Sequence, residues 1–199
     1  MIRRALNLVA LDLSLTATGI AVTHDQVGEP RLACRTITPR RRPTQTVIDH
    51  ARLHETFQAV AATLACQPHL VVIEFLPRVS GTGGTPLRLA ELHGALKHYL
   101  WAKGHRYVDV EPQHLKTYAT GNGNAKKELV RQEVTARYGG RVHIGSTDEA
   151  DALALLALAL DGYGQPITDR AGRDIVVPAK NREAVGKVAW PDLDAIGAR

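Results

Sequence analysis

The stretch Leu8–Leu13 reads LVALDL, five apolar residues around a single carboxylate. A continuous apolar run of this length is typical of a strand that is buried on both faces of a sheet. A buried carboxylate without a partner costs several kcal/mol, so it usually protonates, pairs with a cation or binds a metal. Asp12 is therefore the first candidate functional residue.

Two further stretches place carboxylates in apolar surroundings. Leu70–Phe75 reads LVVIEF and puts Glu74 at the end of a second buried strand, where Glu is disfavoured. Asp148–Leu156 reads DEADALALL and opens a helix that is apolar nearly all round. Asp148 and Asp151 are three residues apart and share one helical face. Together the three stretches predict an acidic cluster that holds divalent cations.

Structural interpretations of single residues remain open beside this one. Asp12 would serve equally well as a strand-end residue that bonds the amides of the following turn. Ser146–Glu149 fits a capping box, which gives Glu149 a structural role and leaves it outside the predicted site. The helix dipole partly explains Asp148. Asp151, one turn further into an apolar helix, has no such explanation.

The bulk composition fits one globular domain. The chain has 199 residues, 44% of them hydrophobic and 23% charged, which is enough for one buried core and a short appendage. Its formal net charge of +5 is compatible with a nucleic-acid partner. Cys34 and Cys66 lack metal-ligand spacing and are expected to be reduced. Without an evident signal peptide or bilayer-spanning run, we expect a cytoplasmic protein that does not contact membranes.

The order of predicted elements indicates an α/β fold. Three consecutive strands are followed by alternating helices and strands, which favours a mixed β-sheet flanked by helices. We expect one domain over residues 1–162 and a C-terminal extension of unknown role over 163–199, forming a tail or small hairpin packed on the domain. The predicted strands are 5–13, 19–23, 31–38, 70–75 and 107–110, and the predicted helices 44–66, 86–103, 113–118, 125–138 and 147–160.

A glycine-rich segment with lysines lies between the last strand and the last helix. Glu111–Lys116 reads EPQHLK, and Thr120–Lys127 reads TGNGNAKK. Gly121 and Gly123 allow the backbone to approach a phosphate closely, and the next helix offers its N-terminus. The alternative is a flexible loop with solvated lysines.

The four acidic positions and this segment, in this order, resemble the RuvC-type Holliday junction resolvases of the ribonuclease H-like superfamily. The resemblance runs from about residue 5 to residue 161. It implies a ribonuclease H-like fold in which Asp12, Glu74, Asp148 and Asp151 bind two Mg²⁺ ions per active site, with Mn²⁺ as a substitute. Carboxylate ligands suit these hard cations.

The resemblance also implies the activity, a crossover junction endodeoxyribonuclease. A homodimer would nick two opposing strands of a four-way DNA junction and leave 5′-phosphate and 3′-hydroxyl ends. Lys116 and Lys127 would contact the DNA near the cut, with Lys127 counted among the catalytic residues and Leu115 in place of the commoner Val. Any partner branch-migration helicase is unknown. The predicted DNA-binding residues are Lys116, Lys126, Lys127, Arg40, Arg41, Arg42, Arg78 and Arg88.

The family places its dimer interface on the helix that here spans about 86–103. Its leucines would supply that surface, or they would face their own core; helical periodicity fits both interpretations. These leucines are Leu87, Leu89, Leu92, Leu96 and Leu100.

Two departures from the family pattern stand out. The loop after Glu74 lacks the aromatic that probes bases in cellular members, and Phe75 is expected to pack in the core. The chain beyond residue 162 lies outside the pattern. Both features suit a phage or mobile-element branch of the family.

Three other functions are compatible with parts of this sequence. A ribonuclease H-like nuclease of the YqgF type, acting on RNA, is the nearest. An ATPase of the actin and sugar-kinase type would need a second subdomain that 199 residues hardly permit. A DNA-binding protein without catalysis would not need four carboxylates that repel its phosphates.

Overall fold

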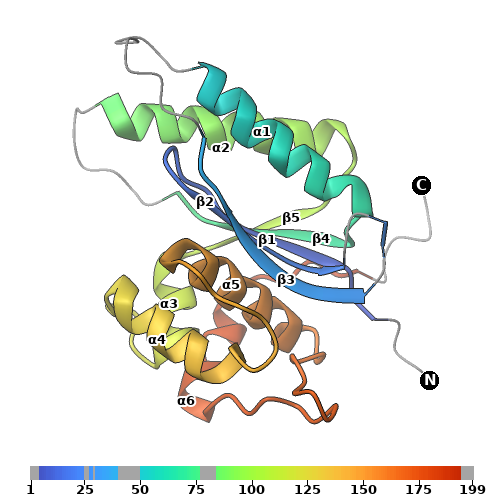
Figure 1. Cartoon of the computed structure of the whole chain (residues 1–199), viewed down its shortest axis with the longest axis vertical. Helices are drawn as coiled ribbons and strands as arrows, with labels where there is room; N and C mark the ends of the chain where they lie inside the picture. Colours follow the sequence, from blue (N-terminus) through green and yellow to red (C-terminus); the bar gives the residue numbers. More distant parts are fainter. Residues whose placement is uncertain (1–4, 25–26, 29, 40–49, 77–83, 194–199) are drawn as a thin grey trace.

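A five-stranded mixed sheet, flanked by helices on both faces, forms the centre of the molecule (Figure 1). The computed structural model describes residues 5–24, 27–28, 30–39, 50–76 and 84–193. The strands are β1 (Leu8–Asp12), β2 (Thr18–His24), β3 (Pro30–Ile37), β4 (Leu70–Glu74) and β5 (Tyr107–Val110). The helices are α1 (His50–Thr63), η1 (Leu64–Cys66), α2 (Gly84–Ala102), α3 (Pro112–Thr120), α4 (Lys127–Tyr138), α5 (Thr147–Gly162), α6 (Ala179–Arg182) and η2 (Val185–Lys187).

The strand order β3-β2-β1-β4-β5 combines both kinds of pairing. The first three strands form an antiparallel meander, whereas β4 runs parallel to both β1 and β5. In the β1–β4 ladder Leu11 lies opposite Ile73. The predicted mixed sheet is confirmed, and its parallel centre brings the carboxyl ends of β1 and β4 to the same edge.

Two apolar layers sandwich this sheet. Side chains alternate along a strand, so Val9 and Leu11 face the layer that contains α1 and α2. Leu8 and Ala10 face the opposite layer, which contains α3, α4 and α5 (Figure 1). Because β1 is flanked on both sides and covered on both faces, all five of its residues are buried.

Helix α5 is the most buried helix of the described chain. Every residue from Ala150 to Asp161 is buried, which explains why its sequence is apolar nearly all round. It packs across β1 and β2, with α4 and α3 on its outer side. The start of this helix therefore carries its two carboxylates to the end of β1 where Asp12 lies.

The leucines of α2 divide between core and surface. Leu92, Leu96 and Leu100 are buried against the sheet, as the core interpretation predicts. Leu89 is half-buried beside them, whereas Leu87 is 70% exposed. Most of the predicted interface leucines thus belong to the core of their own chain.

The chain beyond α5 packs on the layer of α3, α4 and α5. Residues 163–193 contain one antiparallel bridge between Thr168 and Asp174, followed by α6 and η2. Ile167 and Val177 are buried against that layer. Both cysteines are free thiols, as expected. None of the helices in the described segments combines the length and hydropathy that crossing a bilayer requires.

Candidate active site

Asp12 and Glu74 lie side by side at the carboxyl edge of the sheet. Leu11 pairs with Ile73, so the next residues of the two parallel strands, Asp12 and Glu74, are neighbours. Both follow the alternation that directs Leu8, Ala10, Leu70 and Val72 toward α5. The two carboxylates therefore lie between the sheet and the start of α5.

The first turn of α5 supplies two more carboxylates. Ser146 caps the helix, and its Oγ accepts a hydrogen bond from Glu149 N at 3.1 Å. Glu149 Oε2 accepts from Gly145 N at 2.6 Å, and Oε1 accepts from the Thr36 hydroxyl. This engagement confirms the structural role predicted for Glu149 and leaves Asp148 and Asp151 to form the cluster.

The ammonium of Lys127 lies among these carboxylates. Lys127 Nζ is 3.4 Å from Asp151 Oδ2, 3.5 Å from Asp148 Oδ1 and 4.0 Å from Asp12 Oδ2. The lysine is the first residue of α4, which packs against α5. Burial alone would lower the pKa of Lys127, but the charges of the three carboxylates and of Glu74 raise it above its usual range. The ammonium therefore stays charged and offsets part of the negative charge.

Burial dominates the acidity of the cluster. It raises the pKa of Asp12 well above 3.8, and the neighbouring Glu74 carboxylate raises it further. Burial also raises the pKa of Glu74, and burial with the Asp12 charge raises the pKa of Asp151 to about 7. Such shifts mean that Asp12, Glu74 and Asp151 are more stable when they are protonated or paired with a cation than when they are ionised without a partner.

Asp12 carries an unsatisfied oxygen. Its side chain is buried, and within the described residues Oδ2 has no hydrogen-bond partner. The amide of Ser14, which the strand-end interpretation assigned to Asp12, donates to Thr18 Oγ1 instead. A buried carboxylate oxygen without a donor is costly, which favours a cation at this position.

The donor set suits a divalent metal ion. Four carboxylates from β1, β4 and α5 offer only oxygen ligands, the type that Mg²⁺ and Mn²⁺ prefer. Among the described residues, no three Asp, Glu, His or Cys side chains are arranged closely enough to hold a metal ion without rearrangement. Lys127 is the cation that the carboxylates share in this conformation.

The predicted phosphate-binding segment flanks the cluster. Lys116 on α3 is near enough for its charge to lower the pKa of Glu74, against the larger effect of burial. Gly121 ends α3 with φ +75°, a left-handed conformation that favours glycine. In the loop that follows, Asn122 and Asn124 are exposed. Thus the cluster has Lys127 within it and Lys116 beside it.

The other predicted DNA-binding residues lie outside the described segments or form no ion pair with the four carboxylates within them. Arg40, Arg41, Arg42 and Arg78 lie outside the described residues. Arg88 is on α2, where it pairs with Glu91 at 3.4 Å. Lys126 is exposed next to Lys127. Within the described chain, Lys127 is therefore the predicted DNA-binding residue that contacts the carboxylates, and Lys116 acts on Glu74 through its charge.

Phe75 departs from the prediction that it packs in the core. It is half-buried at the end of β4, and Lys97 Nζ lies 5.6 Å from the centre of its ring. Lys97 is held there by an ion pair with Asp109 at 2.8 Å. Phe75 directly follows the last residue of β4, where its amide still donates to Val110 O of β5, and the Lys97 ammonium lies near its ring.

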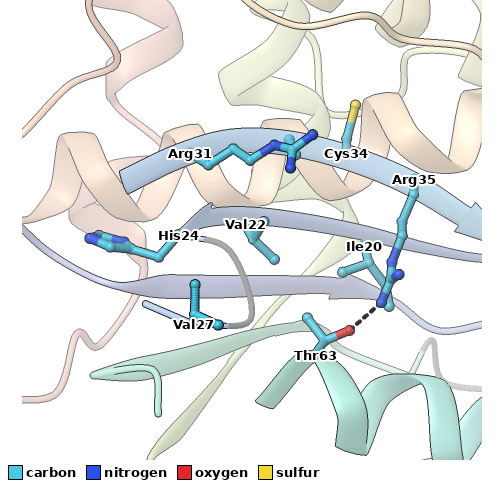
Figure 2. A pocket seen from close by; sticks show the side chains of 9 residues that line it. Ile20, Val22, His24, Val27, Arg31, Cys34, Arg35 and Thr63 are labelled. Atoms are coloured by element: carbon cyan, nitrogen blue, oxygen red, sulfur yellow. Dashed lines mark hydrogen bonds between the residues drawn. The ribbon is translucent and has the colours of Figure 1, made fainter. Parts of the chain in front are cut away.

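A separate hollow lies over β2 and β3, away from the carboxylates (Figure 2). Arg35 Nη2 crosses it to donate to Thr63 Oγ1 at 2.6 Å. None of the four carboxylates contributes to its walls. Its lining residues are Ile20, Val22, His24, Val27, Arg31, Ala33, Cys34, Arg35 and Thr63.

One contact at the site has no signal in the local sequence. The side chain of Asn181, from α6, lies against Gly121: a Cβ atom at that glycine would be 3.1 Å from Asn181 Oδ1. About 60 residues separate the two, and no periodicity links them. Only the packing of the chain beyond α5 reveals that it reaches the phosphate-binding segment.

Comparisons with known proteins identify the arrangement. A family model described as crossover junction endodeoxyribonuclease RuvC matches residues 8–159. The Thermus thermophilus RuvC structure in complex with a Holliday junction substrate is 21% identical, with a TM-score of 0.62, over 81% of this chain and 96% of that one. A second Thermus thermophilus RuvC structure is also 21% identical, with a TM-score of 0.56, over 80% and 98%. Comparison with curated proteins gave no match.

The two structural likenesses establish a ribonuclease H-like fold, as predicted. The family match extends over most of the chain, including β1, β4 and the first turns of α5. It favours the resolvase over the RNA-processing and ATPase alternatives, and the family's activity depends on divalent metal ions. The chain belongs to the RuvC family, and it is a crossover junction endodeoxyribonuclease.

Proposed function

We propose that the chain acts as a homodimer that makes paired nicks in opposing strands of a four-way DNA junction, using two Mg²⁺ ions per site held by Asp12, Glu74, Asp148 and Asp151. The observation that carries the assignment of ligands is the meeting of carboxylates from β1 and α5 around one ammonium, with Glu74 of β4 next to Asp12. A cluster with so much uncompensated charge needs cations, because its members otherwise take up protons.

The carboxylate oxygens of the cluster would hold the metal ions. The orphaned Asp12 Oδ2 and the all-oxygen donor set fit Mg²⁺, with Mn²⁺ as a substitute. When bound, such ions activate water for in-line attack at phosphorus and stabilise the departing oxygen. The carboxylates of β1, β4 and α5 fix the position of this chemistry at the carboxyl edge of the sheet.

The lysines act on the substrate phosphate. The ammonium of Lys127 would contact a phosphate oxygen of the substrate, since its side chain is 57% exposed. Lys116 approaches from α3 on the Glu74 side. Two cations aimed at one phosphate would orient it for attack and offset its charge as the P–O3′ bond breaks.

Branched DNA is the proposed substrate. A structural relative is described with a Holliday junction substrate, and its fold matches over 81% of this chain. The exposed Asn122, Asn124 and Lys126 beside the cluster would hold the sugar-phosphate backbone without reading sequence. The arginines Arg40, Arg41, Arg42, Arg78 and Arg88 would extend this basic surface.

Cleavage of synthetic substrates tests the proposal. A four-way junction, a linear duplex of the same sequence and an RNA–DNA hybrid are each incubated with the protein in Mg²⁺ or in EDTA. We expect symmetric nicks in the junction alone, and only with metal. Equal cutting of the hybrid or of RNA would place the protein in another branch of the superfamily.

The substitution Asp12→Asn tests the ligand assignment. It preserves the shape of the side chain but removes one charge, so we expect the cleavage rate to fall by about a thousandfold or more. Junction binding should be unchanged or tighter, because less negative charge faces the phosphates. A folded variant that loses binding as well as cleavage would show that Asp12 does not act as a metal ligand.

A further inference from the structure

The chain beyond α5 is built onto the flank of α3. Asn181 is buried, and its Nδ2 donates to the carbonyl oxygen of Tyr118 at 2.9 Å. That carbonyl belongs to the last turn of α3, where helical partners are lacking. In Figure 1 the α6 segment lies below α5, on the same side of the sheet as α3 and α4. The extension thus meets α3 where the Gly121–Asn124 loop begins.

A second contact fixes the extension to α5. Arg182 reaches the buried carboxylate of Asp161 through two bonds, Nε to Oδ2 at 2.9 Å and Nη2 to Oδ1 at 2.7 Å. Two parallel bonds of this kind hold both partners in one orientation. The indole of Trp190 packs on Gly162 and donates from Nε1 to Val185 O at 3.0 Å. Three anchors therefore hold residues 181–190 in place.

This anchored segment displays two lysines beside α3. Both Lys180 and Lys187 are exposed, and neither forms an ion pair within the described segments. Lys180 Cδ is 3.7 Å from where a Cβ at Gly121 would lie. Lys187 lies on η2, which packs against α3. Burial lowers the pKa of His114 on α3, the Glu111 charge raises it, and the positive charge of Lys187 lowers it. Lys180 therefore adjoins the end of α3, and Lys187 its first turn.

Helical geometry places these lysines across α3 from the active site. At about 100° per residue, His114 and Gly121 fall on one flank of the helix, while Lys116 lies roughly 200° from His114 on the other. The outer face between the two flanks includes Gln113 and Thr117, which are not buried. Helix α3 therefore has Lys116 on one flank and Lys180 and Lys187 on the other.

We propose that Lys180 and Lys187 form a second phosphate-binding surface, which holds the sugar-phosphate backbone of a junction arm that passes over α3. The inference rests on the proposed function, since it takes the same DNA as its ligand. The family match ends at residue 159, so the surface belongs to this chain's own extension. Lysines of this kind add affinity and orientation but read no sequence.

The test compares two double variants in binding assays. Lys180→Ala with Lys187→Ala removes the proposed surface. Lys103→Ala with Arg141→Ala removes the same charge from the ends of α2 and α4. Anisotropy of a labelled four-way junction is measured in EDTA between 50 and 200 mM salt. We expect the first variant to bind about tenfold more weakly, with a salt slope smaller by about 2.

Two further readouts separate binding from catalysis and from folding. The single-turnover rate at saturating protein should stay within about twofold of the wild type, because the lysines do not contact the reacting atoms. Replacing both lysines with arginine should restore affinity. Binding and salt slope equal to those of the control variant would overturn the inference. Wild-type protein that binds the junction without cutting it would instead overturn the proposed function and leave the binding comparison valid.

Discussion

Lys127 neutralises part of the carboxylate cluster in this conformation. Its Nζ lies within 4.0 Å of three carboxylates, and burial raises the pKa of two of them, Asp12 and Asp151. A divalent ion entering the cluster would compete with this ammonium for the same oxygens. The lysine thus stabilises the metal-free site, a role that conflicts with the phosphate contact proposed for it.

The substitution Lys127→Met separates these roles. Removing the competing charge should tighten Mn²⁺ binding by about tenfold, a modest part of the repulsion between charges some 4 Å apart. Cleavage should nevertheless fall by about a hundredfold, because a phosphate contact is lost. Calorimetric titration with Mn²⁺ measures the first effect, and junction cleavage the second. Lys126→Met is the matched control, and Mn²⁺ binding no tighter than in that control would contradict the prediction.

The raised pKa of Asp151 predicts how stability depends on pH without metal. The folded protein holds this proton up to about pH 7, whereas the unfolded chain releases it near 3.8. The folded state therefore binds more protons in this window, and the free energy of unfolding falls as pH rises. Between pH 5 and 7 we expect a loss of about 2 kcal/mol relative to Asp151→Asn.

Urea unfolding in EDTA, run in parallel on wild type and Asp151→Asn, measures this difference. Comparing the two proteins cancels the titration of groups elsewhere in the chain. Saturating Mg²⁺ should remove the decline, because metal replaces the proton. Parallel pH profiles for the two proteins in EDTA would show that Asp151 ionises freely in the folded state.

The carboxylates could be predicted from sequence because each breaks a local pattern. Asp12 and Glu74 interrupt apolar strands, and Asp151 interrupts an apolar helix face. The position of Lys127 among them could not be derived in that way, since it depends on how α4 packs on α5. The Arg182–Asp161 pair was not predicted either, because it joins residues of two segments with no common periodicity.

At the scale of elements, the packing of α5 on β2 is set by Gly19. A Cβ atom there would lie 2.0 Å from the carbonyl oxygen of Asp148, closer than any real contact. The backbone of α5 therefore approaches β2 as closely as it does only because this residue has no side chain. The carboxylates of Asp148 and Asp151 owe their position to that approach.

The substitution Gly19→Ala should displace the start of α5. The obstacle is backbone and cannot rotate away, so we expect a loss of about 3 kcal/mol in the free energy of unfolding. Cleavage should fall further than this loss explains, because Asp148 moves. Gly140→Ala, just after α4, is the control: nothing lies within 4 Å of its added methyl, so the free energy of unfolding should change by no more than about 0.5 kcal/mol. Wild-type cleavage by Gly19→Ala would contradict this account.

Periodicity predicted most elements but not the extension. The predicted strand 107–110 coincides with β5, and the helix predicted from residue 147 coincides with the start of α5. The predicted start of the first long helix lies outside the described residues. Helix α6 has only four residues, too few for an apolar period, and contacts of Asn181 and Arg182 with α3 and α5 hold it in place. Such an element could be found only from tertiary packing.

At the scale of the whole molecule, the sheet separates catalysis from the candidate dimer surface. The carboxylates lie on the α5 side, whereas α2 lies on the opposite face (Figure 1). On α2, Leu87 and Trp101 are 70% and 73% exposed. They are separated by about four helical turns and so lie on nearly the same side of the helix. Exposed large apolar side chains aligned in this way are typical of an interface.

The double substitution Leu87→Glu with Trp101→Glu should therefore yield a monomer, measured by light scattering. A monomer still holds a complete carboxylate cluster, so it should nick one strand of a junction. In a dimer, the first bound active site raises the effective concentration of the second active site at the opposing strand, and the monomer lacks this effect. On a supercoiled plasmid with an extruded cruciform, we expect nicked circles, with linear product reduced about tenfold.

The control is Val176→Glu, which places a charge on an exposed apolar residue outside α2 and should leave the molecular mass and the amount of linear product unchanged. A double variant that stays dimeric would exclude this surface of α2 as the interface. A monomer that still linearises the plasmid would show that paired cutting does not need the dimer.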